Sequence, residues 1–251
     1  MVKKALFILL FTGFVFAATP EQVLVNLGGA GLVVDDMVDE NSNPDISKIT
    51  KSLQDNGKLQ LLVDKKTKTV LNFNSNANGV LLLKSIENMI SNLRYGDYQN
   101  LNFVNNENSS YSIVVNLDRI PNPGEIYKEL KKSNIFINDV KKGAGSFTYF
   151  LDLSKASIYA TAFGSEYKKP TKPYFINVNG KKTVSIEVQE GDTWHPSVKI
   201  FDKNLNLIDS LVQDSPQKSI NFELPENAHY IQVDDGSSLE NIQKGLKFNL
   251  Q

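Results

Sequence analysis

Hydrophobic and polar residues alternate along the last third of the chain with the period of two that is typical of half-buried β-strands. The alternation is regular in Val184–Val188, in Ile220–Leu224 and in Leu246–Leu250. Polar turn sequences such as Asp202–Asn206 separate the runs. Six or seven short strands in so few residues predict an all-β sandwich over residues 174–251.

Residues 18–157 instead combine helix-like and strand-like spacing. Two stretches of 33 residues, 43–75 and 122–154, both open on Asn-Pro and close on Ser. In each, the asparagine can cap a helix and the proline suits its first position. Two strand-like runs follow each helix, and a longer variant of the unit, capped by Asn78, lies between the two copies. The pattern predicts an internal αββ repeat.

The strand-like runs of this region predict antiparallel hairpins. The runs pair as Val23–Leu27 with Leu32–Met37, Leu59–Val63 with Thr69–Phe73, Leu101–Val104 with Tyr111–Leu117, and Ile135–Val140 with Phe147–Leu153. The expected order is ββ-αββ-αββ-αββ, with the helices on one face of the hairpins. The fold class is therefore α+β, an αββ repeat module followed by a jelly-roll-like sandwich.

The first 17 residues have the layout of a secretory signal peptide. Lys3 and Lys4 precede the apolar run Ala5–Phe16, and Val15 and Ala17 occupy the −3 and −1 positions of a cleavage site. An uncleaved N-terminal anchor is the alternative. We expect the mature chain to begin near residue 18, in the periplasm or, alternatively, secreted.

A change of composition predicts a linker over residues 158–173. The sequence GSEYKKPTKP contains Gly164 and Pro170 and few large aliphatic residues. Four basic residues and one acidic residue lie within 155–172, whereas the flanking regions are mildly acidic. Glycine, proline and polar residues between two patterned regions are typical of a domain boundary.

Composition excludes several classes of protein. The chain has no cysteine, so it forms no disulfide and no thiolate metal site. Removal of Lys3 and Lys4 from 27 basic side chains leaves 25 against 28 acidic ones, a net charge of −3. These charges are scattered singly, which argues against nucleic acid and against insertion in, or electrostatic docking on, a membrane after cleavage.

One loop stands out as a candidate binding site. Asp192, Trp194 and His195 lie within four positions, and Trp194 is the only tryptophan. The loop connects two predicted strands, so a structural role for the tryptophan is the leading interpretation, and ligand stacking on its ring is the alternative. Zinc would need three or four ligands, and His229 is the only other histidine. We therefore predict no catalytic, cofactor-binding or metal-binding residue.

The last third of the chain resembles bacterial pre-peptidase C-terminal (PPC-like) domains. The resemblance rests on the order of YFINVNGKKTVSIEV, PSVKIFDKNLNLIDS, SINFELPENAHYIQV and GLKFNL between Tyr174 and Leu250. It implies a jelly-roll-like sandwich that assists binding or folding without catalysis. His195-Pro196 stands where that family has an Asp-rich strand entry, so its calcium ligands are not evident. Asp234 and Asp235 are too few for a six-to-eight-oxygen site and are predicted to form a solvated turn.

The helix-hairpin order of residues 43–154 is similar to BON domains and to the ring-building modules of secretion and flagellar components. That similarity implies docking to other envelope proteins, or self-association. The expected function is therefore non-enzymatic docking or assembly in the bacterial cell envelope, with an accessory of a flagellar motor or secretion system as one form. A glycan- or peptide-binding module at the end of the sandwich is the alternative. An enzyme with an unrecognised carboxylate pair is the third hypothesis.

Overall fold

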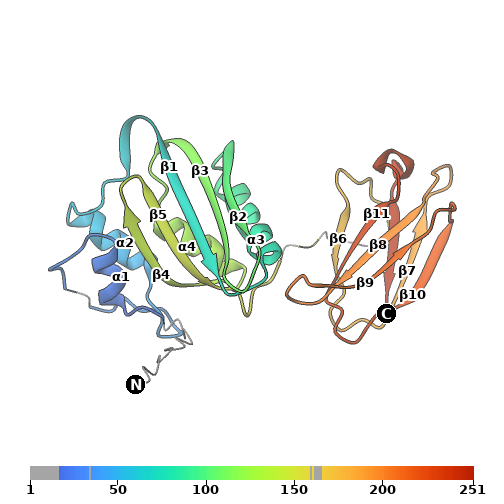
Figure 1. Ribbon diagram of the computed structural model, residues 1–251, viewed down its shortest axis with the longest axis horizontal. Helices are drawn as coiled ribbons and strands as arrows, with labels where there is room; N and C mark the ends of the chain where they lie inside the picture. Colours follow the sequence, from blue (N-terminus) through green and yellow to red (C-terminus); the bar gives the residue numbers. More distant parts are fainter. Residues whose placement is uncertain (1–16, 34, 159, 161–165) are drawn as a thin grey trace, which may run out of the picture.

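The computed structural model describes residues 17–33, 35–158, 160 and 166–251. The predicted signal peptide lies outside the described residues except for Ala17. The chain combines helices with mostly antiparallel strands, as the patterning predicts, and Figure 1 shows a helix-and-sheet part followed by an all-β part. No helix among the described residues is long and apolar enough to cross a membrane.

Four α-helices lie in the described part of the first half. They are α1 (Pro20–Asn26), α2 (Ile46–Asp55), α3 (Gly79–Leu93) and α4 (Pro123–Lys132). Asn78 caps α3 and Asn122 caps α4, with Pro123 at the first helical position, as predicted. The predicted helix with Ile46, Ile49 and Leu53 on its buried side is confirmed as α2. Only its predicted cap is wrong, because the side chain of Asp45, two residues after Asn43, accepts from the backbone N–H groups of the first turn.

The predicted N-terminal hairpin is wrong, because residues 20–26 form α1. Thr19 and Gln22 make a reciprocal capping box, and Pro20 occupies the first turn. Val23 and Leu27 then lie on one buried side of the helix. Thr-Pro-Glu-Gln carries this signal in the sequence, but the alternating Val23–Leu27 was interpreted as a strand.

The first half forms one five-stranded sheet. Its strands are β1 (Leu62–Ser75), β2 (Tyr98–Val104), β3 (Ser109–Arg119), β4 (Phe136–Gly143) and β5 (Ser146–Asp152), in the order β2-β3-β1-β5-β4. The β2–β3 and β4–β5 hairpins are confirmed. β1 and β5 run parallel, so the sheet is mixed and not a row of antiparallel hairpins.

The hairpin predicted within residues 59–73 is also wrong. Residues 62–75 form a single strand of 14 residues that pairs with β3, with an irregularity between Leu62 and Thr67. The intervening Asp-Lys-Lys-Thr-Lys contains only one residue that turns favour, Asp64, and no glycine, proline or asparagine. The element order is therefore α-αβ-αββ-αββ in place of the expected ββ-αββ-αββ-αββ.

The helices cover one face of the sheet, as Figure 1 shows and as the sequence predicts. Alternate strand residues such as Leu71, Phe73, Ile113 and Tyr149 are fully buried against the helices. The residues between them form an open polar face, where Ser112 Oγ donates to Asn72 Oδ1 over 2.8 Å. The core therefore lies entirely on the helical side of the sheet.

The second half is a sandwich of two antiparallel sheets. Its strands are β6 (Tyr174–Asn177), β7 (Thr183–Val188), β8 (Pro196–Phe201), β9 (Leu207–Val212), β10 (Ser219–Glu223), β11 (Tyr230–Asp235) and β12 (Leu246–Leu250). A 3₁₀ turn, η1 (Leu239–Ile242), precedes β12. The sheet orders are β10-β7-β12 and β6-β11-β8-β9. Ile186, Val198, Ile231 and Phe248 share the core between the sheets.

The two halves contact each other around α3. Phe175 and Tyr230 of the sandwich stack at 5.1 Å and pack with the core of the first half. Lys84 Nζ on α3 lies 4.5 Å from the centroid of the Phe175 ring. The backbone N–H of Ile158, inside the predicted linker, donates to the Tyr230 hydroxyl over 3.3 Å.

Candidate functional site

Trp194, the centre of the candidate binding loop, is 0% exposed. Its ring belongs to the sandwich core, and its Nε1–H donates to the Asp234 carbonyl over 3.0 Å. Its backbone forms an isolated bridge with Gln217. The ring therefore offers no surface on which a ligand could stack, and the structural interpretation of the tryptophan agrees with this burial.

The other two residues of the loop hold neighbouring backbone in place. Asp192 Oδ2 accepts from the backbone N–H of Lys244 over 2.7 Å, which joins the loop to the start of β12. The backbone N–H of His195 donates to Asp235 Oδ2, also over 2.7 Å. The structure thus brings His195 to Asp235, and it gives Asp192 and His195 the same kind of role, the ordering of loops at one end of the sandwich.

Asp235 is a buried carboxylate, whereas the sequence predicts a solvated turn. Its side chain is 0% exposed. Besides the contact with His195, Oδ1 accepts hydrogen bonds from the N–H groups of Ser237 and Ser238 and from the Asn241 amide, over 2.8–2.9 Å. Burial alone would raise the pKa of this carboxyl, but the hydrogen bonds outweigh burial and hold the pKa below its ordinary value.

His195 Nδ1 lies 3.5 Å from Asp235 Oδ2, so one histidine and one carboxylate are close together. Across the described residues, no group of three or more histidine, cysteine, aspartate or glutamate side chains is placed to hold an ion.

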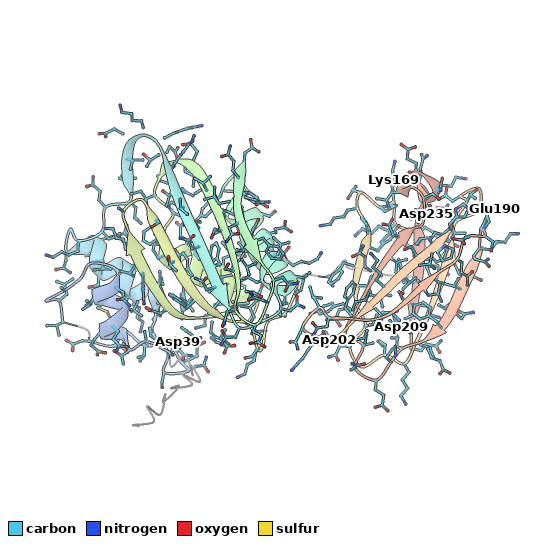
Figure 2. All side chains as sticks on the ribbon, viewed as in Figure 1. Asp39, Lys169, Glu190, Asp202, Asp209 and Asp235 are labelled. Atoms are coloured by element: carbon cyan, nitrogen blue, oxygen red, sulfur yellow. The ribbon has the colours of Figure 1, made fainter. Side chains whose placement is uncertain are left out.

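A different feature, a hollow, lies at the other end of the sandwich. It has a volume of about 1120 Å³ and lies where the carboxyl ends of β1 and β5 meet the β8–β9 turn. Nine of its lining residues are asparagines: Asn74, Asn76, Asn78, Asn105, Asn106, Asn108, Asn138, Asn204 and Asn206. We call it the asparagine cavity. Figure 2 marks Asp202, next to the β8–β9 turn, at the opposite end of the sandwich from Asp235.

Local hydrogen bonds organise the rim of the asparagine cavity. Asp202 Oδ1 accepts from the backbone N–H groups of Asn204 and Asn206 over 2.8 Å, which closes the β8–β9 turn. Asn78 Nδ2 donates to Asn206 Oδ1 over 2.7 Å and so joins the two halves of the chain across the cavity. Gly79 N–H donates to Asn105 Oδ1 over 2.8 Å, and the start of α3 is thereby satisfied without a ligand.

Several of the lining amides remain unpaired. Among the described residues, the side chains of Asn74, Asn76, Asn138 and Asn204 have no hydrogen-bond partner within the protein. Each amide offers two donors and one acceptor. This site was not predicted from the sequence. The asparagine-rich segments 72–78 and 105–108 and the turn Asp202–Asn206 carry a compositional signal, but they were interpreted only as turns or left aside.

The edge strand β2 is a second candidate site. In the described sheet β2 pairs only with β3, and its sequence YQNLNFV carries no charge. Leu101 is 54% exposed and Phe103 43%. The opposite edge, β4, carries Lys141 and Lys142 and accepts a backbone hydrogen bond from Ala18. Lysines and covering segments are common protections of edge strands, and β2 has neither, although an irregularity interrupts its pairing with β3 between Asn100 and Asn102.

Searches of family models, of curated proteins and of solved structures found no match to this chain. The site geometry and the fold therefore carry the functional argument.

Proposed function

We propose that this protein is an exported, non-enzymatic docking protein of the bacterial cell envelope and that β2 is its docking element. The charge-free edge of β2, which pairs only with β3 in the described sheet, carries the proposal. An extended segment that pairs with such an edge gains main-chain hydrogen bonds, and exposed side chains beside it supply specificity. Leu101 and Phe103 would supply the apolar contacts of such an interface.

The proposed occupant is an extended, uncharged segment of another envelope protein. α3 contacts the sandwich through Lys84 and Asn78, and Figure 1 shows β2 and α3 on the side of the sheet that faces the sandwich. A second copy that continued the sheet at β2 would need the space of the sandwich. One added strand widens the sheet by only about 4.8 Å. An added strand therefore needs far less space beside β2 than a whole subunit does.

The proposal also includes three finer points: the first half derives from a repeat, the sandwich is jelly-roll-like, and it is PPC-like. Both resemblances imply docking or assistance without catalysis, and the absence of a recognisable catalytic motif in the sequence agrees with them. A role as an accessory of a larger envelope complex is the form of the function that fits these resemblances.

We expect a photo-crosslinking amino acid at position 101 to give a discrete adduct in intact cells. Leu207 on the edge strand β9 is the matched control, since it is 57% exposed and equally apolar, and no adduct is expected there. Phe103→Lys in the same chain should reduce the adduct at position 101 at least tenfold, because lysine opposes pairing at an edge strand. The readout is immunoblotting followed by mass spectrometry of the adduct.

Three outcomes would contradict the docking proposal. An adduct of twice the chain mass would show self-association at β2 in place of a different partner. Equal adducts at positions 101 and 207, or none at either, would remove β2 as the docking element. The melting temperature of the Phe103→Lys chain should stay within a few degrees of the parent, since surface substitutions change stability by about 0.5 kcal/mol or less.

Export is tested separately. Mass spectrometry of the protein from the envelope fraction should give an N-terminus near Ala18, because the cleavage pattern ends at Ala17. Recovery of the intact Met1 on exported protein would support the anchor alternative.

A further inference from the structure

The asparagine cavity has a lining suited to a neutral ligand. Asp152 is the only charged side chain among the described residues that line it. The N-terminus of α3, which could otherwise attract an anion, is satisfied by Asn78 and Asn105. Neither charge nor a helix terminus therefore selects an ionic ligand.

The unpaired amides favour a ligand that both donates and accepts hydrogen bonds at many closely spaced points. Asn74 and Asn138 approach from the sheet and Asn204 from the sandwich, so the groups converge from three elements. Hydroxyl and acetamido groups of a saccharide have this dual character, as do the amides themselves. A few convergent polar groups of this kind are what fixes a ligand in a pocket.

Phe150 supplies an aromatic ring beside the amides, and Lys141 Nζ lies 5.2 Å from the centroid of this ring. Phe150 is the strand neighbour of Asn74 in the parallel β1–β5 pair and lies on the open face, opposite in parity to the buried Tyr149 and Leu151. The negative face of an aromatic ring attracts the partially positive C–H groups of a sugar ring. A sugar stacked on Phe150 would place its edge against the amide of Asn74.

We propose that the asparagine cavity binds a neutral oligosaccharide, stacked on Phe150 and hydrogen-bonded by Asn74, Asn138 and Asn204. A volume of about 1120 Å³ exceeds the range of about 300–1,000 Å³ that is typical of single small-molecule sites. More than one sugar unit therefore fits. An extended peptide is disfavoured, because peptide recognition needs a free strand edge or apolar side-chain pockets, and the lining leucines Leu151 and Leu153 are buried.

The test uses the mature chain and isothermal titration calorimetry with the tetramer of N-acetylglucosamine, cellotetraose and tetraglycine. We expect binding of at least one of the two saccharides and none of tetraglycine. Asn74→Ala and Asn204→Ala should each weaken saccharide binding five- to tenfold, since each removes one or two hydrogen bonds to the saccharide and no hydrogen bond within the protein. Phe150→Leu should weaken it tenfold or more.

Asn179→Ala is the matched control, because Asn179 lies in the exposed β6–β7 turn and does not line the cavity. Its affinity should stay within twofold of the parent. Side-chain amide signals in the ¹H–¹⁵N spectrum of the unsubstituted chain provide a second measurement, and those of Asn74, Asn138 and Asn204 should shift on titration. This measurement needs no variant and does not depend on how the substitutions affect folding.

Three outcomes would overturn the inference. They are no binding of either saccharide at millimolar concentration, binding that the cavity variants leave unchanged, and tetraglycine binding with the same sensitivity to the variants. The first and second remove the saccharide site, and the third replaces it with a peptide site. None of them bears on β2, so docking at the sheet edge and binding in the cavity can fail separately.

Discussion

Trp194→Ala is expected to lower the free energy of unfolding of the sandwich by about 3 kcal/mol or more, the range measured for large-to-small changes at buried aromatic residues. The ring is fully buried and fills the space between the two sheets, and the carbonyl of Asp234 would also lose its hydrogen bond from Nε1. Removal therefore combines a cavity with the loss of a hydrogen bond to a partly buried acceptor. For a domain of this size the melting temperature should fall by about 10 °C or more.

Two further substitutions separate the contributions of the ring. Trp194→Phe keeps most of the apolar volume and loses the hydrogen bond, so we expect an intermediate loss of about 1–2 kcal/mol. Val212→Ala, at an exposed apolar position on β9, should change stability by about 0.5 kcal/mol or less. The unfolding of all three variants is measured by calorimetry or circular dichroism, because the alanine and phenylalanine variants at position 194 lack the fluorescent ring.

In the unsubstituted chain, fluorescence should show a blue-shifted maximum and little quenching by iodide, since the only tryptophan is buried. A red-shifted, readily quenched emission together with an unchanged melting temperature for Trp194→Ala would contradict the structural role. With that result, the loop of Asp192, Trp194 and His195 would again be a candidate binding surface.

Asp235→Ala is expected to lower the free energy of unfolding of the sandwich by about 3 kcal/mol at neutral pH, because several buried donors lose their acceptor together. The carboxylate accepts from three backbone N–H groups, those of His195, Ser237 and Ser238, and from the Asn241 amide. Asp235→Asn should lower the free energy of unfolding by less than Asp235→Ala, although one of these donors would then face the amide NH₂ group. Asp234→Asn is the control, because its side-chain oxygen can still accept from the Asp235 N–H.

The effect of Asp235→Asn should depend on pH. The folded-state pKa of Asp235 lies below that of an unfolded aspartate, which is about 3.9. The carboxylate therefore stabilises the fold above that pH, and the stabilisation is lost as the pH falls through the lower folded pKa. Urea unfolding followed by Trp194 fluorescence should show that the difference between parent and variant narrows below about pH 4. A difference that is constant with pH would contradict the role of the charged form.

Local sequence patterns predicted the elements whose interactions are local. The alternation in Val184–Val188 and Leu246–Leu250 produced the expected strands, because one face of each lies in a core. Asn78 caps α3, and Asn122 with Pro123 starts α4, as predicted. A helix cap can be predicted because it depends only on neighbouring residues. The N-terminal segment was mispredicted although Thr19–Gln22 carries a capping box, because the short apolar alternation that follows fits helix and strand equally.

The sequence by itself determined the strands of the sandwich, the helices α3 and α4 and the lack of any disulfide, because these depend on residue type and short-range spacing. Only the tertiary structure decided that β1 is one strand beside a parallel β5, that Trp194 is buried, and that Asn74, Asn138 and Asn204 converge. Pairing partners and cavities depend on contacts between segments far apart in the chain. The geometry of these pairings and cavities follows from how sheets and helices pack against each other. No local sequence pattern encodes that packing.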